Sequence, residues 1–267
     1  MSIKATLKQS NMLIGMVRDI RAIRASLEDR STIHALKSYC DSHSVKRLHL
    51  GAGTNSLPGW FTTDLFPESR DVFRLDATRP LPIKDNSFDF IFCEHMIEHI
   101  SWIDALGMLK ECNRILRPGG IIRISTPDLA VLLHLYPTPA DRLAGHYVDW
   151  ANRNFIDYGT DPLPRDANKS VFVINNAFRA WGHQFLYDGH TLALALEAAG
   201  FREILRCRPQ ESRHGDLRGI ERHGETINCE TNAADEYVGV DLNAFETISY
   251  EAMASDRGLA VQHERLG

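Results

Sequence analysis

The sequence contains few cysteines, and those it contains are not arranged in pairs. Five cysteines are scattered over 267 residues, and no C-x-x-C motif occurs. An odd number of dispersed cysteines argues against a disulfide framework, so we expect reduced thiols and a cytoplasmic protein.

The sequence also lacks long apolar runs, internal repeats and an excess of positive charge. No apolar stretch reaches the roughly 18 residues that a membrane span needs, and no basic-then-apolar leader opens the chain, so we expect no membrane span. The formal net charge of −5 argues against an extended nucleic-acid surface. A hydrophobic content of 43% is ordinary for a globular protein, and the length suits one large domain or one domain with an insertion.

What the chain does contain is a glycine turn between two short β-rich runs. Residues 45–50 (VKRLHL) alternate toward an apolar end and stop at the Gly-Ala-Gly of 51–53, which indicates a buried strand and a turn whose backbone faces a ligand. The second run, 60–63, ends in Asp64. An open α/β sheet holds a nucleoside in this way, because the glycines let the ligand approach the main chain and the acid accepts from the ribose hydroxyls.

Beyond Asp64, strands and helices alternate, which predicts right-handed crossovers and one largely parallel sheet. Asp188 is expected to cap a helix, and the last two strands fit an antiparallel pair at one end of the sheet. The predicted strands are 71–75, 88–93, 121–125, 201–206 and 245–250, and the predicted helices are 102–116 and 189–199.

Two segments lie outside this alternation. Residues 5–39 carry a helical stripe of apolar residues among arginines and lysines, and we favour a helix that caps the sheet over a membrane-surface or partner-binding helix. Residues 128–181 combine proline-broken helical runs with eight aromatic residues. They form either a lid over the carboxyl edge of the sheet or a helical subdomain with an aromatic core. The chain thus divides into a helical extension (1–44), a main domain (45–255) with an insertion at 128–181, and a flexible tail (256–267).

Five motifs follow one another between residues 48 and 125: LHLGAGTNSLPGW, TTD, LDA, SFDFIFCEHMIEHI and ILRPGGIIRIS. Together they resemble the class I methyltransferases that use S-adenosylmethionine, and within these the type-11 group of small-molecule and saccharide methyltransferases. The resemblance implies a Rossmann-like α/β fold with helices on both faces of the sheet. Its seven-stranded, mostly parallel sheet would have the order 3-2-1-4-5-7-6, and S-adenosyl-L-methionine would be the cofactor.

The resemblance also implies a cofactor site at the carboxyl edge of that sheet. The implied residues are Gly51, Ala52 and Gly53 against the amino-acid and ribose part, Asp64 at the ribose hydroxyls, Leu65, Asp76 and Ala77 around the adenine, and Glu94 at the methionine end.

The chain departs from the family pattern in two places. His49 stands where the family often has an acid, and Asn55 stands where it often has a third glycine. Asp64 follows Gly53 after only eleven residues, and Pro58-Gly59 interrupts this stretch. The first crossover helix is therefore expected to be shortened or replaced by a loop, without the dipole that a helix would contribute.

Two histidines are the candidate catalytic residues. Methyl transfer from a sulfonium mainly requires alignment, and a base is useful when the acceptor is a hydroxyl. His95 follows the predicted strand 88–93, and His183 closes the segment 128–181. Each is expected to act as a base or to orient the substrate, with a purely structural hydrogen bond as the alternative.

The pattern His95-x-x-Glu98-His99 raises the further option of a metal site. On a helix these three side chains share one face, as metal ligands would, and some methyltransferases that act on catechol-like or terminal-ribose hydroxyls use a related group. The pattern also matches the inverted zinc-peptidase motif, but a peptidase would not explain the glycine turn or the strand-end acids. We therefore assign no metal, and expect Glu98 to cap a helix and His99 to pack against the next one.

These observations predict an S-adenosylmethionine-dependent methyltransferase that acts on a small-molecule or saccharide acceptor, at a hydroxyl group. The alternative is a catalytically silent, cofactor-binding scaffold that acts through protein contacts, with the basic amino-terminal helix as its docking element.

Overall fold

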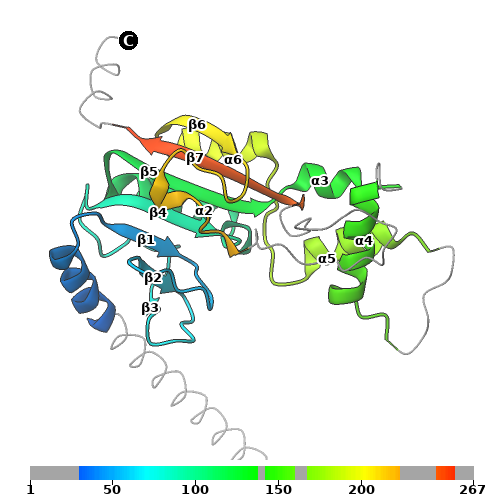
Figure 1. Cartoon of the computed structure of the whole chain (residues 1–267), viewed down its shortest axis with the longest axis horizontal. Coiled ribbons are helices and arrows are strands. Elements are labelled where there is room, and N and C mark those ends of the chain that lie inside the picture. The colour runs from blue at the N-terminus through cyan, green and yellow to red at the C-terminus, as the bar shows by residue number, and fades with distance from the viewer. Residues whose placement is uncertain (1–29, 138–141, 160–166, 223–244, 256–267) are drawn as a thin grey trace, which may run out of the picture.

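The structure, a computed structural model, describes residues 30–137, 142–159, 167–222 and 245–255. They form a seven-stranded sheet in the order β3-β2-β1-β4-β5-β7-β6, which confirms the predicted order. The first five strands in this order pair in parallel, and β7 is antiparallel to both β5 and β6 (Figure 1). The strands are β1 (Arg47–Leu50), β2 (Phe61–Asp64), β3 (Phe73–Arg74), β4 (Phe88–Glu94), β5 (Leu116–Pro127), β6 (Phe201–Cys207) and β7 (Thr247–Ala254).

Helices connect or flank these strands. Residues 30–42 are helical, and α6 begins at the predicted cap, where Asp188 accepts a hydrogen bond of 2.7 Å from the Thr191 amide. Every helix in the described part of the chain is too short or too polar to cross a bilayer. The named helices are the 3₁₀ helices η1 (Ile97–His99) and η2 (Gly215–Leu217) and the α-helices α2 (Trp102–Ile115), α3 (Leu129–His134), α4 (Arg142–Phe155), α5 (Lys169–Arg179) and α6 (Gly189–Ala198).

Some predicted strand boundaries were wrong. β3 has only two residues, Phe73 and Arg74, because it pairs only with the last two residues of β2, Thr63 and Asp64. β5 begins five residues earlier than predicted, because Leu116 already pairs with Phe88, and a register shift between Phe88 and Phe90 accommodates the Gly119-Gly120 turn. The last strand starts and ends later than predicted, at Thr247–Ala254, because its partners in β5 and β6 extend that far.

The first crossover contains no helix. Residues 51–60, which join β1 to β2, form only turns and irregular backbone, as the short spacing predicted. One face of the sheet carries the main apolar core, to which the helical residues 30–42, α2 and α6 all contribute; its members include Leu36, Leu48, Ile91, Leu109 and Leu196. Complete burial of one such side chain contributes about 1.5–3 kcal/mol to stability.

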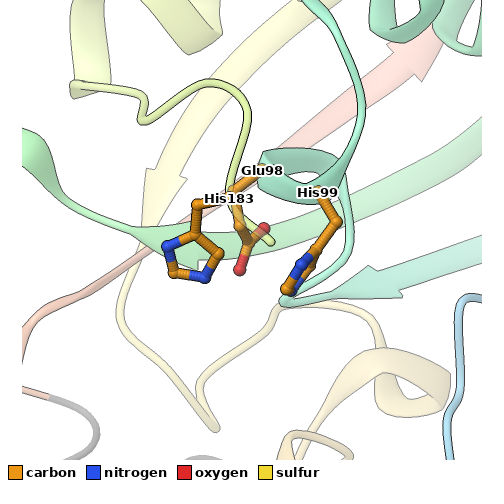
Figure 2. Close-up of side chains that lie close together, drawn as sticks. All are labelled: Glu98, His99 and His183. Carbon is orange, nitrogen blue, oxygen red and sulfur yellow. The ribbon is translucent and has the colours of Figure 1, made fainter. Parts of the chain in front are cut away.

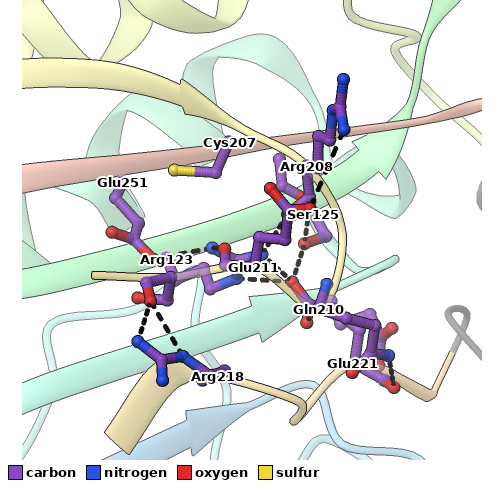
Figure 3. A network of polar contacts seen from close by, with 12 residues as sticks. Arg123, Ser125, Cys207, Arg208, Gln210, Glu211, Arg218, Glu221 and Glu251 are labelled. Atoms are coloured by element: carbon purple, nitrogen blue, oxygen red, sulfur yellow. Dashed lines mark hydrogen bonds and ion pairs between the residues drawn. The ribbon is translucent and has the colours of Figure 1, made fainter. Parts of the chain in front are cut away.

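The segment 208–222, here called the strap, packs on the opposite face of the sheet, where the polar side chains of Arg123 and Glu251 are buried together with Phe92. The fully buried Arg123 of β5 forms ion pairs with Glu221 of the strap and Glu251 of β7 (Figure 3). Arg123 also donates to the main-chain oxygens of Arg208 and Glu211, each at 3.0 Å. One guanidinium thus holds both ends of the strap against the middle of the sheet.

Helices α3, α4 and α5 form a separate layer beyond the carboxyl ends of β4 and β5 (Figure 1). They share a second apolar core, in which Tyr147 and Trp150 are buried. Trp181, at the end of this segment, is 54% exposed instead. The aromatic residues of the segment therefore serve both the core and the surface.

Several predictions fall on residues that the structure does not describe. The apolar stripe and the basic residues before residue 30 and the tail from residue 256 lie outside the described residues. Of the amino-terminal helix, only 30–42 is described, and there Leu36 is buried in the main core.

His49 lies in the middle of β1 and is almost completely buried. Its ring packs at 5.0 Å from the ring of Phe92, and within the described residues no hydrogen bond reaches its Nδ1. Burial lowers the pKa of His49 to about 4. The folded protein therefore keeps this imidazole neutral at physiological pH.

We expect Arg123→Leu to lower the free energy of unfolding by about 3–5 kcal/mol, because it leaves two buried carboxylates without their cation. Chemical denaturation at neutral pH measures this change. Arg208→Ala is the matched control, because its side chain is 85% exposed and forms only a long contact of 3.9 Å with Glu211. A change of less than 1 kcal/mol in Arg123→Leu would show that the network is not needed for stability.

We expect His49 to make the protein less stable as the pH falls from about 6.5 to about 4. The folded pKa lies below the ordinary value, so the unfolded chain takes up the proton first and stability is lost across this window, by up to about 3 kcal/mol. Denaturation at a series of pH values gives the slope. His49→Gln should reduce that slope, and an unchanged slope would contradict the assignment.

Candidate active site

A cavity of about 530 Å³ opens at the carboxyl ends of β1, β2 and β4. Seven of the sequence-predicted residues line it: Gly51, Gly53, Asp64, Leu65, Asp76, Ala77 and His95. Ala52, Glu94 and His183 are not among its lining residues. His99, considered above only for a metal site, also lines it, and the remaining lining residues, which were not predicted, are Phe66, Leu75, Thr78, Met96, Ile100, Trp181 and Gly182.

The glycine turn needs its two glycines for different reasons. Gly51 has a φ of +65°, and a Cβ placed on it would lie 2.1 Å from Cγ of Met96, so the main chain at Gly51 packs directly on the turn after β4. Gly53 has a φ of +53°, but a Cβ placed there would meet nothing within 4 Å. Positive φ alone therefore favours glycine at 53, and the space beside it is open. Between the two glycines, the Ala52 amide donates to the main-chain oxygen of Thr63 at 3.0 Å. This bond fixes the turn on β2.

Asp64 is held at the cavity by two main-chain hydrogen bonds. Its Oδ2 accepts from the Gly53 amide and its Oδ1 from the Phe66 amide, both at 2.8 Å. Each carboxylate oxygen has a second lone pair. The side chain is thus oriented by the protein and still able to accept hydrogen bonds from a ligand.

Asp76 is engaged in its own turn. Its Oδ1 accepts from the amide and the hydroxyl of Thr78, at 3.0 and 2.6 Å, and its Oδ2 lies 3.1 Å from Nε of Arg79. Beside it, Leu65, Ala77 and Ile100 give the cavity an apolar wall. This part of the cavity offers an apolar surface bordered by one acid.

Glu94 lies on the strap side of the sheet. Its Oε2 accepts from the Arg222 amide at 3.0 Å, and the Arg222 guanidinium donates to Oγ1 of Thr54 at 2.9 Å. Side chains alternate along a strand, and Cys93 belongs to the main core, so Glu94 faces the other way. Glu94 therefore connects the glycine turn to the strap, and its predicted contact with the methionine end stays a prediction.

His95 lines the cavity and is partly exposed, and it pairs with Glu98, which is completely buried behind it. Nδ1 of His95 lies 3.4 Å from Oε1 of Glu98, and its Nε2 lies 3.0 Å from Oγ1 of Thr247. Burial acts to lower the pKa of His95, but contact with Glu98 outweighs it and raises that pKa above its ordinary value. Burial acts to raise the pKa of Glu98, and contact with His95 outweighs it and lowers that pKa. Both shifts favour a charged pair.

His183 lies close to this pair but outside the cavity lining. Its Nδ1 lies 2.6 Å from the Ala177 oxygen, and burial lowers the pKa of His183 below its ordinary value. Its ring centroid is 4.8 Å from that of His99. Figure 2 shows the two rings on either side of the Glu98 carboxylate.

The metal-ligand grouping considered from the sequence was only partly right. Residues 97–99 form a short 3₁₀ helix, and His95 precedes it with a φ of +45°, so the three residues of the pattern do not share a face of an α-helix. The structure instead brings His183, from far along the chain, to Glu98 and His99, with one ligand atom of each within 4.8 Å of the others. Spacing within one motif could not show this contact.

Residues 50–124 match the methyltransferase domain family. Together with the strand order, this match identifies the fold. The chain has the fold of the class I methyltransferases. Its segments also resemble curated methyltransferases: a probable S-adenosylmethionine-dependent methyltransferase of Mycolicibacterium smegmatis, with 44% identity over 48 residues, and a demethylmenaquinone methyltransferase of Staphylococcus aureus, with 39% identity over 59 residues. The matches cover 18% and 21% of this chain, and only 18% and 24% of those two proteins.

Solved structures resemble the methyltransferase domain more distantly. A methyltransferase of Thermotoga maritima, described as a possible histamine N-methyltransferase, has 17% identity and a TM-score of 0.42, over 90% of this chain and 96% of that one. A chain from the complex between the Trm112 methyltransferase activator and a putative methyltransferase of Haloferax volcanii has 15% identity and a TM-score of 0.41, over 87% and 93%. The strand order, and not these superpositions, identifies the fold.

S-adenosylmethionine is the cofactor of this domain family, and the cavity fits it in three respects. Its volume of about 530 Å³ is in the range of small-molecule sites. The space beside Gly53 is open to a ligand that approaches the main chain. The Asp64 carboxylate is fixed by two amides and keeps lone pairs for a diol. Residues 51–53, Asp64 and the apolar wall are therefore the groups that would hold the cofactor.

We expect Asp64→Ala to weaken the affinity for S-adenosylmethionine by about 10- to 100-fold, because hydrogen bonds to a charged acceptor contribute about 1.5–3 kcal/mol. Isothermal titration calorimetry measures the dissociation constant. Asp71→Ala is the control, because this nearby acid is exposed and does not line the cavity. Equal affinity of Asp64→Ala and the wild type would remove Asp64 from the cofactor site.

Proposed function

We propose that this protein is an S-adenosylmethionine-dependent methyltransferase that transfers the methyl group to an oxygen of a small-molecule or saccharide acceptor. The observation that supports this most is the make-up of one cavity. Its β1–β2 side has the glycine turn and Asp64, and its other side has His95, His99 and Trp181. A nucleoside-binding half thus faces a half with polar and aromatic side chains.

The main contribution of the chain is alignment. S-adenosylmethionine supplies a methyl group on a positively charged sulfur, which departs as a neutral thioether. The protein has to hold the acceptor oxygen in line with that bond, and orientation of this kind is worth about 7–11 kcal/mol of the barrier. The two fixed bonds to Asp64 and the close packing of Gly51 on Met96 keep the cofactor half of the cavity rigid.

His95 is proposed as a positioning residue for the acceptor. Both of its ring nitrogens have partners, Glu98 on one side and Thr247 on the other. A ring held in this way keeps a fixed orientation at the cavity floor. His183 is the second histidine proposed near the acceptor, and within the described residues no hydrogen bond engages its Nε2.

Trp181 is proposed as the surface on which the acceptor stacks. It lines the cavity and is 54% exposed, although it is one of the largest apolar side chains of the protein. Its φ of +57° and that of Gly182, +78°, place the ring on a tight turn. An exposed indole at the opening of a site suits a sugar or an aromatic ring.

Turnover tests this function. We expect the purified protein to convert S-adenosylmethionine to S-adenosylhomocysteine only in the presence of an acceptor, when it is offered a panel of nucleotide sugars and small phenols. Liquid chromatography with mass spectrometry measures both products. Trp181→Ala should raise the KM for the acceptor about threefold to tenfold, as expected for the loss of one stacking contact, and should leave the affinity for the cofactor unchanged.

Phe178→Ala is the matched control, because Phe178 is also exposed, at 48%, but does not line the cavity. Cofactor binding without turnover on any member of the panel would contradict methyl transfer to such acceptors. An equal effect of the two variants on KM would contradict the stacking role of Trp181.

A further inference from the structure

We infer that Glu98, His99 and His183 form a binding site for one divalent transition-metal ion. The three residues contribute one carboxylate and two imidazoles, and one ligand atom of each lies within 4.8 Å of the others (Figure 2). Two histidines and a carboxylate are a ligand set that binds Zn²⁺, Fe²⁺ or Co²⁺ and leaves positions open for a further ligand.

The distances require a side-chain adjustment. Tetrahedral coordination with bonds of about 2.0–2.1 Å places any two ligand atoms about 3.4 Å apart. A pair at the 4.8 Å limit therefore has to close by roughly 1.4 Å, which rotations of the His99 and His183 side chains provide. His99 is partly exposed.

The main chain brings the two halves of the site together. The amides of Gln184 and Phe185 donate to the main-chain oxygen of Glu98, at 2.7 and 3.2 Å. The side-chain Nε2 of Gln184 donates to the main-chain oxygen of His99 at 2.8 Å. His183 directly precedes these residues. Three hydrogen bonds thus connect the His183 segment to η1 without using any of the candidate ligand atoms.

Glu98 can bind a metal ion beside its ion pair with His95, because that pair is long and leaves Oε1 without a hydrogen bond within the described residues. Its side chain is completely buried, and its Oε2 accepts from the Thr126 hydroxyl at 2.9 Å. Within the described residues, Oε1 accepts no hydrogen bond, and the closest cation is Nδ1 of His95 at 3.4 Å. A buried carboxylate oxygen without a hydrogen bond is costly, and a metal ion beside it would supply the missing partner.

His183 has the orientation of a metal ligand. Its Nδ1 lies 2.6 Å from the Ala177 oxygen, so Nδ1 carries the proton and Nε2 has the free lone pair. Histidines that bind metals are commonly fixed in this way, by a hydrogen bond from the other ring nitrogen to a carbonyl or carboxylate. The Thr126 hydroxyl fixes Glu98 from the other side in the same manner.

The ion would stand at the acceptor side of the cavity. His99, Trp181 and Gly182 all line the cavity, so an open coordination position next to His99 is accessible from it. This last step rests on the proposed function: a hydroxyl of the acceptor would bind the ion there, and the ion would lower its pKa, so that its proton passes to solvent water at the cavity opening before the oxygen accepts the methyl group. The metal site itself does not depend on methyl transfer.

Binding of Co²⁺ to the untagged, metal-stripped full-length protein tests the site. We expect one equivalent of Co²⁺ with visible absorption bands, displaced by Zn²⁺. His183→Gln and His99→Gln should each weaken Co²⁺ binding at least 100-fold. Thr126→Val should weaken it about tenfold, because it removes the bond that orients Glu98 while leaving all three ligands in place.

His190→Gln is the matched control, because His190 is exposed and belongs to no candidate cluster in the described part of the chain. Circular dichroism confirms that each variant is folded. The inference is overturned if the wild type binds no Co²⁺ at 100-fold excess, or if His183→Gln binds it as tightly as His190→Gln does. Calorimetry with S-adenosylmethionine is run separately on the same samples, so failure of the metal site and failure of the cofactor site are told apart.

Discussion

The parallel pairing of β1 with both β2 and β4 is the constraint on which the rest of the molecule depends. In register, Leu50 lies beside Thr63 on one side and Cys93 on the other, so the chain leaves all three strands at nearly the same level. The glycine turn, Asp64 and the turn before η1 are therefore neighbours, although they are separated in sequence. In a parallel sheet such neighbours meet at the carboxyl edge, where ligands of open α/β folds bind. The close packing of Gly51 on Met96 is the most direct result of this arrangement.

The face of the sheet opposite the main core is organised by the strap. Residues 51–60 form only turns and no crossover helix, and the buried Arg123 attaches the strap to β5 and β7. Burying one guanidinium with two carboxylates contributes little net stability, but it fixes the position of the strap, because any other position leaves charges unpaired. Arg222 at the end of the strap then reaches Thr54 in the glycine turn. A buried ionic network thus supports the cofactor side of the cavity from behind.

The strand order was predicted from the family resemblance of the motifs, and not from local patterns. Local patterns were enough to predict the missing crossover helix and the residues at the ends of β1 and β2, because these depend on short-range spacing. The position of Glu94 could also have been found, since it follows Cys93 in an alternating strand and must face the strap. The contact of His183 with Glu98 and His99 could not have been predicted from the sequence. It depends on main-chain hydrogen bonds from Gln184 and Phe185 across 85 residues, and such bonds leave no signature in side-chain identity.

The tight turn at Trp181 and Gly182 lies far along the chain from the strands that form the nucleoside half of the cavity, and it belongs to the end of the helical layer α3–α5. Under the proposed function, the acceptor therefore meets two distant stretches of polypeptide, the turn after β4 with His95 and His99 and the turn at Trp181. Replacement of residues 128–186 by a homologous stretch would change the surface on which the acceptor stacks and leave the residues that hold the methyl donor in place, so diversification of such a catalyst can begin with the exchange of one segment.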